Sequence, residues 1–245
     1  MKMPSNHLKL HTGMSNKNSF LIVDNREGTS QLPDELIPML CSSSCDSLLL
    51  LESSSKADIN MRILERDGSE SDACINGCLL VWDYFSNNKK GSIQLKKKIV
   101  ELYKDDNDIF LSITGEYKIQ PWSQGRFLDM MDPHLVIKYD DPIKDFTHFA
   151  QNKQKEFGRE VNVDGYFGIH ENRVNIITYE RGVNNLTMSC GSGALSTAII
   201  LHQSEMKHCD KINVLSSGGL HTVVFSENVI KIGTKRNRIK LEELW

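Results

Sequence analysis

Two cysteine segments of the chain have the same design. In "DACINGCLLVW" (72–82) and "TMSCGSGALST" (187–197), a cysteine stands three residues before a glycine, at the start of a run that is typical of a helix. The N-terminus of a helix has unpaired backbone N–H groups and a partial positive charge, which favour a thiolate. The same N–H groups can bind a carboxylate. Cys74 and Cys190 are therefore candidates for a pair of reactive groups.

The chemistry that suits such a pair is proton exchange at the α-carbon of an amino acid. Two helix N-termini that face one ligand would bind its α-carboxylate, and Gly77, Gly191 and Gly193 would let the backbone approach closely. A thiolate would remove the α-proton on one face, and a thiol would deliver a proton on the other. Because this proton is weakly acidic, the site needs a placed base and electrostatic stabilisation of the carbanion.

The elements that must position these cysteines are mostly strands. Apolar runs bounded by turn residues predict strands at 19–24, 47–52, 59–64, 98–104, 109–114, 135–139, 165–170, 173–179, 211–215, 222–226 and 229–233. Short polar connections, twice the dipeptide "EN", favour antiparallel hairpins over βαβ crossovers. Helices are predicted at 75–86, 191–206 and 142–156.

This order of elements is a weak internal repeat. Strands, a cysteine segment that opens an apolar helix, and more strands occur twice, with Cys74 and Cys190 116 residues apart. A helix that is apolar on most sides belongs in an interior. We therefore predict an α/β fold of the α+β type, with two pseudo-symmetric domains, each a curved, mostly antiparallel sheet around a central helix. The domains are expected at 1–115 and 116–234, with the tail 235–245 packing against the first.

Composition excludes several classes of function. The chain has 39% hydrophobic and 25% charged residues and no apolar run of the ~18–20 residues that cross a bilayer. A net charge of −3 with scattered Lys and Arg gives no cationic field for nucleic acid. The N-terminus lacks an apolar signal core, so we expect a cytoplasmic protein with no membrane partner. Six cysteines are too few for a secreted disulfide scaffold. A homodimer is left open.

Four segments carry a resemblance to a known family: "RDGSESDACINGC" (66–78), "MDPHLVI" (131–137), "VNVDG" (161–165) and "YERGVNNLTMSCGSGA" (179–194). In order and spacing they resemble diaminopimelate epimerase. Similarity extends weakly along the chain, and "HTGMSNKNSF" (11–20) resembles the family segment His-Gly-Leu-Gly-Asn-Asp-Phe with residues inserted. The second cysteine motif, with its preceding Glu-Arg-Gly, is the most specific part.

The resemblance implies a cofactor-independent isomerase with one active site in the cleft between its two domains. Its substrate would be a small amino acid, with interconversion of LL- and meso-diaminopimelate, a precursor of lysine and peptidoglycan, as the leading activity. Cys74 and Cys190 would be the base and acid, with His134 and Glu180 beside the reacting centre. The substrate-binding residues implied by the motif matches are Asn18, Glu65, Asn76, Gly77, Asp132, Asn162, Arg181, Gly191 and Ser192.

Departures from the family pattern affect the expected substrate. Glu65 and Asp132 replace family asparagines, Ser47 replaces a glutamine, and Ile75 replaces the glycine after the first cysteine. Two acids in place of amides would repel a distal carboxylate, unless Arg181 offsets them or they hold protons. A racemase of lysine, arginine or histidine is therefore the alternative.

Structural interpretations of the same residues stand beside the catalytic one. Cys41 and Cys45, with Cys74 and Cys78, have a loose spacing for a zinc site, which would make the chain a metal-stabilised binding module. Cys209 and the other cysteines that match no family position are expected to be structural. A relative that binds a ligand without turnover is a third class, which intact cysteines disfavour.

Overall fold

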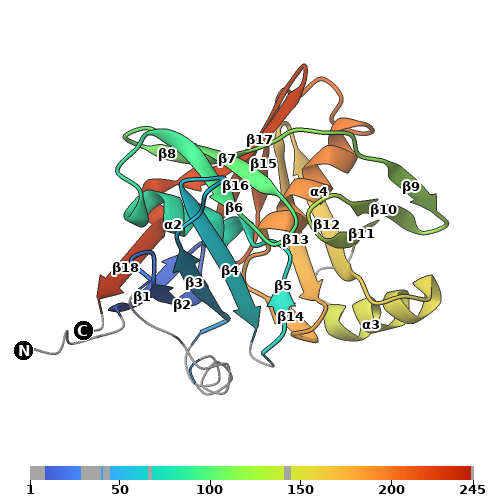
Figure 1. Ribbon diagram of the computed structural model, residues 1–245. Helices are drawn as coiled ribbons and strands as arrows, with labels where there is room; N and C mark the ends of the chain where they lie inside the picture. The colour runs from blue at the N-terminus through green and yellow to red at the C-terminus, as the bar shows by residue number, and fades with distance from the viewer. Residues whose placement is uncertain (1–8, 29–39, 41–44, 66–67, 141–144, 244–245) are drawn as a thin grey trace, which may run out of the picture. The chain divides into compact units, whose positions relative to one another are not determined.

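The computed structural model describes residues 9–28, 40, 45–65, 68–140 and 145–243 (Figure 1). The chain divides into two compact units. Unit 1 comprises 1–111 and 235–245, and unit 2 comprises 112–234. Cys41 and the start of the predicted helix at 142–144 lie outside the described residues. Each unit is described separately below.

Unit 1 is a mixed sheet with one long helix, α2 (Ile75–Phe85). Its strands pair in the order β18-β1-β2-β3-β4-β6-β7, with the short β5 beside β4. A short 3-10 helix, η2 (Arg236–Arg238), precedes β18. The strand bounds are β1 Lys9–Ser15, β2 Asn18–Asp24, β3 Ser47–Glu52, β4 Ile59–Glu65, β5 Glu70–Ser71, β6 Lys90–Gln94, β7 Ile99–Lys104 and β18 Ile239–Glu243. The next strand along the chain, β8 (Asp108–Ile113), crosses the boundary between the units.

Unit 2 has the same kind of sheet and two helices, α3 (Phe146–Phe157) and α4 (Gly191–His202). Its strands pair in the order β9-β10-β11-β12-β13-β15-β16-β17, with the short β14 beside β13. The strand bounds are β9 Ile119–Trp122, β10 Gly125–Asp129, β11 Pro133–Lys138, β12 Asn162–His170, β13 Arg173–Glu180, β14 Asn185–Thr187, β15 Lys211–Leu215, β16 Leu220–Ser226 and β17 Val229–Lys235.

The short connections were predicted to favour antiparallel hairpins over crossovers, and this holds for most strands but not for all. Most neighbouring strands are antiparallel, and both "EN" turns do close hairpins. However, β4 lies parallel to β6 across α2, β13 lies parallel to β15 across α4, and β11 lies parallel to β12 across α3. A helix between two strands of one sheet returns the chain to the end of the sheet at which the first strand began, so the next strand runs parallel.

These crossovers are also where the internal repeat is located. In unit 1 the order is β4, β5, α2, β6, and in unit 2 it is β13, β14, α4, β15, with the same pairings in both. In each unit a short antiparallel strand therefore leads directly into the cysteine helix. The α+β class and the pseudo-symmetry predicted from the sequence are confirmed.

The two cysteine helices are central in their units because they are apolar on most sides. Residues 75–82 of α2 and 193–201 of α4 are buried. Helix α2 contacts β1, β7 and β18, and α4 contacts β11, β12, β15 and β16 (Figure 1). Burial of this kind stabilises a domain by about 25 cal/mol per Å² of apolar surface. Helix α4 ends at His202, four residues before the predicted end at Met206.

Two residues of the N-terminal motif form the turn between β1 and β2. Ser15 pairs with Asn18, and Asn16 and Lys17 between them have φ angles of 48° and 63°. Two consecutive left-handed residues are typical of the type I′ turn that suits a two-residue hairpin. Asn18 therefore begins β2.

No helix in the described part of the chain is both long and apolar enough to cross a membrane.

Candidate active site: two cysteine half-sites

Both candidate cysteines are the N-cap residues of their helices. Cys74 caps α2 and Cys190 caps α4, each with extended backbone angles. In each case the sulfur accepts a hydrogen bond, at 3.4 Å, from the backbone N–H three residues later, which belongs to Gly77 or Gly193. The structure thus places both sulfurs at helix N-termini in the same geometry, one in each unit.

The unit 1 half-site joins Cys74 to the start of β2. The Cys74 thiol points at Asn18 Oδ1, 3.9 Å away. Asn18 Nδ2 donates to Asp46 Oδ2 at 2.9 Å, and the Ser19 backbone N–H donates to the same oxygen. Asp46 thereby fixes the side chain of Asn18, leaving its carbonyl oxygen turned toward the sulfur.

Glu65 ends β4 in the same unit. Its two carboxylate oxygens accept hydrogen bonds from the hydroxyls of Ser47, at 3.1 Å, and Ser71, at 2.5 Å. Ser47 and Glu65 are direct partners in the β3–β4 register. The sequence departures at 47 and 65 are therefore one hydrogen-bonded pair.

The unit 2 half-site centres on a buried chain of hydrogen bonds. Asp164 Oδ2 lies 2.6 Å from His134 Nδ1, and both side chains are fully buried. His134 Nε2 lies 2.9 Å from Ser192 Oγ, which is 3.3 Å from Cys190 Sγ. Thr178 donates to the other Asp164 oxygen at 2.7 Å. These contacts connect a carboxylate, an imidazole, a hydroxyl and a thiol in one line.

Electrostatics in this chain differ from the expectation for a cysteine at a helix N-terminus. Burial raises the pKa of the Cys190 thiol well above its ordinary value, and the negative charges of Glu180 and Asp164 raise it further. The hydrogen bonds from Ser192 and Gly193 lower this pKa only in part. Cys190 is therefore a protonated thiol at neutral pH.

The pKa of His134 is shifted in the opposite direction to that of an isolated buried histidine. Burial by itself lowers its pKa, but the charge of Asp164 and the hydrogen bond to it raise that pKa, and Asp132 and Glu180 add to this. The net result is a His134 pKa above its ordinary value. The ring therefore accepts a proton more readily than a free histidine does.

A second group, Asp132, Asn162 and Arg181, lies next to His134. Asp132 accepts from Arg181 Nη2 at 2.5 Å and from Asn162 Nδ2 at 2.8 Å. The same Asn162 amide nitrogen lies 3.2 Å from His134 Nε2, and Asn162 Oδ1 accepts from the Arg181 backbone N–H. The guanidinium predicted to bind a substrate carboxylate is therefore engaged by an acid of the chain.

The remaining predicted residues surround the two helix N-termini. Asn76 and Gly77 are in the first turn of α2 and are buried, and Gly191 and Ser192 open α4. Glu180 ends β13, and its charge acts on both Cys190 and His134. The unit 1 and unit 2 groups are thus each assembled from segments distant in the sequence.

Two acids that the sequence analysis did not select hold these half-sites together. Asp46 orients Asn18, and Asp164 orients His134. Asp164 is within the quoted "VNVDG" motif, two residues after Asn162, so both point to the same face of β12. The alternation of strand residues was the available signal. A Cβ at Gly193 would collide with the Asp164 carboxylate, so this acid also requires the glycine.

The zinc alternative finds no support in the described residues. Cys78 is inside α2 with no exposed surface, where its sulfur is packed in the apolar core of the unit. The described part of the chain contains no group of three or more His, Cys, Asp or Glu side chains with metal-binding geometry. Cys41 lies outside that part.

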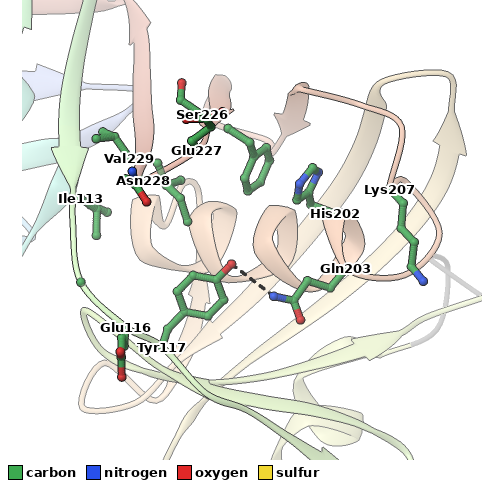
Figure 2. Close-up of a pocket in the computed structure, with 13 residues that line it drawn as sticks. Ile113, Glu116, Tyr117, His202, Gln203, Lys207, Ser226, Glu227, Asn228 and Val229 are labelled. Carbon is green, nitrogen blue, oxygen red and sulfur yellow. Dashed lines mark hydrogen bonds between the residues drawn. The ribbon is translucent and has the colours of Figure 1, made fainter.

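A cavity of about 890 Å³ lies elsewhere in unit 2, away from the predicted residues (Figure 2). It is lined by the C-terminal end of α4, by the turn between β16 and β17 with the adjoining strand ends, and by Ile113, Gly115, Glu116 and Tyr117. His202 stacks on Phe225 with ring centroids 3.9 Å apart, and Gln203 donates to the Tyr117 hydroxyl at 3.2 Å. None of the predicted site residues lines this cavity.

Comparison with known proteins finds relatives of the chain. No family model matches the chain. The diaminopimelate epimerase of Flavobacterium psychrophilum is 26% identical over 241 residues, covering 90% of this chain and 91% of that one. The diaminopimelate epimerase of Chlamydia muridarum is 25% identical, covering 96% of this chain and 89% of its own.

A solved structure shows the same fold at lower identity. The phenazine biosynthesis protein of the PhzF family from Bacillus anthracis superposes with a TM-score of 0.73 and 12% identity, covering 97% of this chain and 99% of that one. The resemblance predicted from the sequence motifs is confirmed by these comparisons. The enzyme class predicted with it, an isomerase, is confirmed as well.

Proposed function

We propose that the chain is one of the diaminopimelate-epimerase-like isomerases and that it exchanges the α-proton of an amino acid between Cys74 and Cys190 without a cofactor. The observation that carries the proposal is the matched geometry of the two helix caps, each with a sulfur bound by the N–H group three residues later. A repeated cap of this kind in two similar units is expected of a two-base site.

The proposed reaction needs both half-sites to act on one substrate. Backbone N–H groups at the starts of α2 and α4 would bind the α-carboxylate and stabilise the charge that develops as the proton leaves. One sulfur, as thiolate, would take the α-proton, and the other, as thiol, would supply a proton to the opposite face. The roles of Cys74 and Cys190 exchange with the direction of reaction.

Interconversion of LL- and meso-diaminopimelate is the leading activity. The relatives that are named diaminopimelate epimerase match at least about nine-tenths of the chain. One contact favours a second candidate, a racemase of lysine, arginine or histidine. Asp132 engages Arg181, so less positive charge remains for a distal carboxylate of the substrate. A substrate with a cationic or neutral distal end would not need this positive charge, so the ion pair would not weaken its binding.

Exchange of the α-proton in D2O tests the proposal. Purified enzyme is incubated with a reductant and with diaminopimelate or one of the L-amino acids lysine, arginine and histidine, and deuterium at the α-carbon is followed by NMR. We expect exchange with one of these substrates. Absence of exchange with diaminopimelate would exclude the leading activity, and absence with every amino acid would overturn the proposed function.

Asp132→Asn distinguishes the two substrate classes. Removing this charge frees Arg181 for a carboxylate, so the variant should improve kcat/KM for diaminopimelate if that is the substrate. For a cationic amino acid it should lower kcat/KM instead. Each change is expected to be about tenfold, the size of a partly exposed ion pair of about 1 kcal/mol or slightly more. Asp129→Asn, an exposed acid on β10, is the matched control.

A further inference from the structure

The line of contacts from Asp164 to Cys190 has two complete hydrogen-bonding states. In the first, His134 is neutral with its proton on Nδ1, which donates to Asp164, while Nε2 accepts from the Ser192 hydroxyl. Ser192 Oγ then accepts from the Cys190 thiol. Asn162 Nδ2, 3.2 Å from Nε2, is a further donor to this form of the ring.

The second state differs by the shift of one proton along the line. The Cys190 S–H proton passes to Ser192 Oγ as the Ser192 O–H proton passes to His134 Nε2. The products are a thiolate and an imidazolium, and Asp164 still accepts from Nδ1–H. The net charge of the four groups is −1 before and after the shift, so no charge enters or leaves the buried site.

We propose that Ser192 relays the proton of Cys190 to His134, and that Asp164 is the positioning residue that makes His134 able to receive it. Cys190 needs such a partner because its thiol is protonated at rest, with Asp164 and Glu180 opposing its ionisation. Asp164 fits the positioning role because it is fully buried and held by Thr178, and because it faces Nδ1 at 2.6 Å.

The relay also gives the Ser192 hydroxyl a different role from the one expected from the sequence. That hydroxyl is already within hydrogen-bonding distance of both His134 and Cys190. The donors left for a substrate carboxylate are then the backbone N–H groups of the first turn of α4. The proton relay itself does not depend on the proposed function. Only the use of the thiolate, as a base toward an amino acid, rests on that function.

Alkylation of Cys190 by iodoacetamide tests the relay without any amino-acid substrate. Trypsin releases this cysteine on the peptide 182–207 and Cys209 on 208–211, so mass spectrometry follows each separately. The readout is the alkylation rate of Cys190 at about pH 7 divided by that at about pH 10, where hydroxide can take the thiol proton without the relay. This ratio cancels differences in access to the sulfur.

Ser192→Ala should lower the ratio by about tenfold or more, because it removes the bridging hydroxyl. Asp164→Asn should lower the ratio less, because the change weakens His134 as a proton acceptor but also removes a negative charge that opposes the Cys190 thiolate. Ser192→Thr, which retains a hydroxyl, should restore it. Ser196→Ala, a buried hydroxyl one turn further along α4, should leave it unchanged. Equal ratios in wild type and Ser192→Ala would overturn the relay, and equal ratios in wild type and Asp164→Asn would remove Asp164 from it.

The two proposals fail in different ways. If the wild type exchanges the α-proton of an amino acid but Cys190 alkylation is unchanged in the variants, the relay is wrong and the function stands. If no amino acid is exchanged while the ratio falls in both variants, the relay stands and the function is wrong. Circular dichroism checks that Asp164→Asn is folded, and the Ser192 variants decide the relay if it is not.

Discussion

At the scale of single residues, we expect the sulfurs of Cys74 and Cys190, unlike those of the other cysteines, to be required for activity. Cys74→Ala or Cys190→Ala should lower the rate of racemisation by roughly 10²–10⁴-fold, because each removes one proton-transfer group. The measurement is the loss of optical activity of a single enantiomer. Full activity in either variant would refute the assignment of two bases.

Cys209→Ala is the matched control for these substitutions. Cys209 is buried in unit 2 like Cys190, but its sulfur points at a backbone carbonyl, that of Glu171 at 3.9 Å. Its loss removes a small apolar volume and no catalytic group. The variant should therefore retain wild-type activity.

The residue types in the sequence predicted where the two cysteines lie better than they predicted the ionisation of those cysteines. The spacing of cysteine, glycine and apolar residues is a local signal, and both helix caps were predicted from it. The ionisation of Cys190 was not, because it depends on burial and on Glu180 and Asp164, which only folding brings close. A helix N-terminus favours a thiolate, but in this site desolvation and two carboxylates outweigh it.

At the scale of elements, α2 is fixed at the end opposite Cys74 by a buried lysine. Lys104 Nζ donates to the carbonyls of Trp82, Asp83 and Ser86 at 3.0, 2.7 and 2.6 Å. Lys104→Met should lower the free energy of unfolding of the protein by about 2–4 kcal/mol, because it leaves these carbonyls of α2 without a charged donor. Urea denaturation followed by circular dichroism measures the change.

The control for this substitution is Lys89→Met in the same unit. Lys89 is exposed, so its replacement should change the free energy of unfolding by no more than about 0.5 kcal/mol. If the two variants unfold at the same urea concentration, Lys104 does not stabilise the C-terminus of α2.

Element types were predictable, and their pairing was not. Helices α2 and α4 begin where the sequence predicts, and the "EN" dipeptides mark two hairpins. The parallel pairs around α2 and α4 were missed because strand direction is set by the path of the chain over the sheet. Short strands such as β5 and β14 were missed because two or three residues carry no periodicity.

At the scale of the whole molecule, His221 makes stability depend on acid pH. Burial lowers its pKa from 6.5 to about 4, so the unfolded chain binds a proton in this range that the folded chain does not. Stability should therefore fall as the pH drops from about 6.5 to about 4, by about 3 kcal/mol from this group. Urea midpoints measured across this range test the slope.

His221→Phe should flatten that slope, since the variant has no group to protonate there. His170→Phe, at an exposed position of the same unit, should leave the slope as in wild type. An unchanged slope in His221→Phe would show that other groups cause the acid dependence. His134, with its raised pKa, acts in the opposite sense and loses its contribution as the pH rises.

The proposed site also makes activity depend on redox state. If Cys74 and Cys190 close on one substrate, mild oxidation with diamide in its absence should join them and abolish activity, and a reductant should restore it. Tryptic peptides 67–89 and 182–207 should then be recovered as one disulfide-linked species. Loss of activity with these peptides unlinked would argue against a shared site, and bound substrate should slow the oxidation.

The sequence by itself determined the reactive residue types, the helices that begin at them and the repeat that relates them, because these depend on neighbours within a few positions. It also carried the motifs that relate the chain to diaminopimelate epimerases. Only the tertiary structure decided that Asp164 faces His134, that Ser192 lies between His134 and Cys190, and that Asp132 engages Arg181. Three of these four contacts join residues 30 to 58 positions apart, and their distances are set by strand register and helix packing.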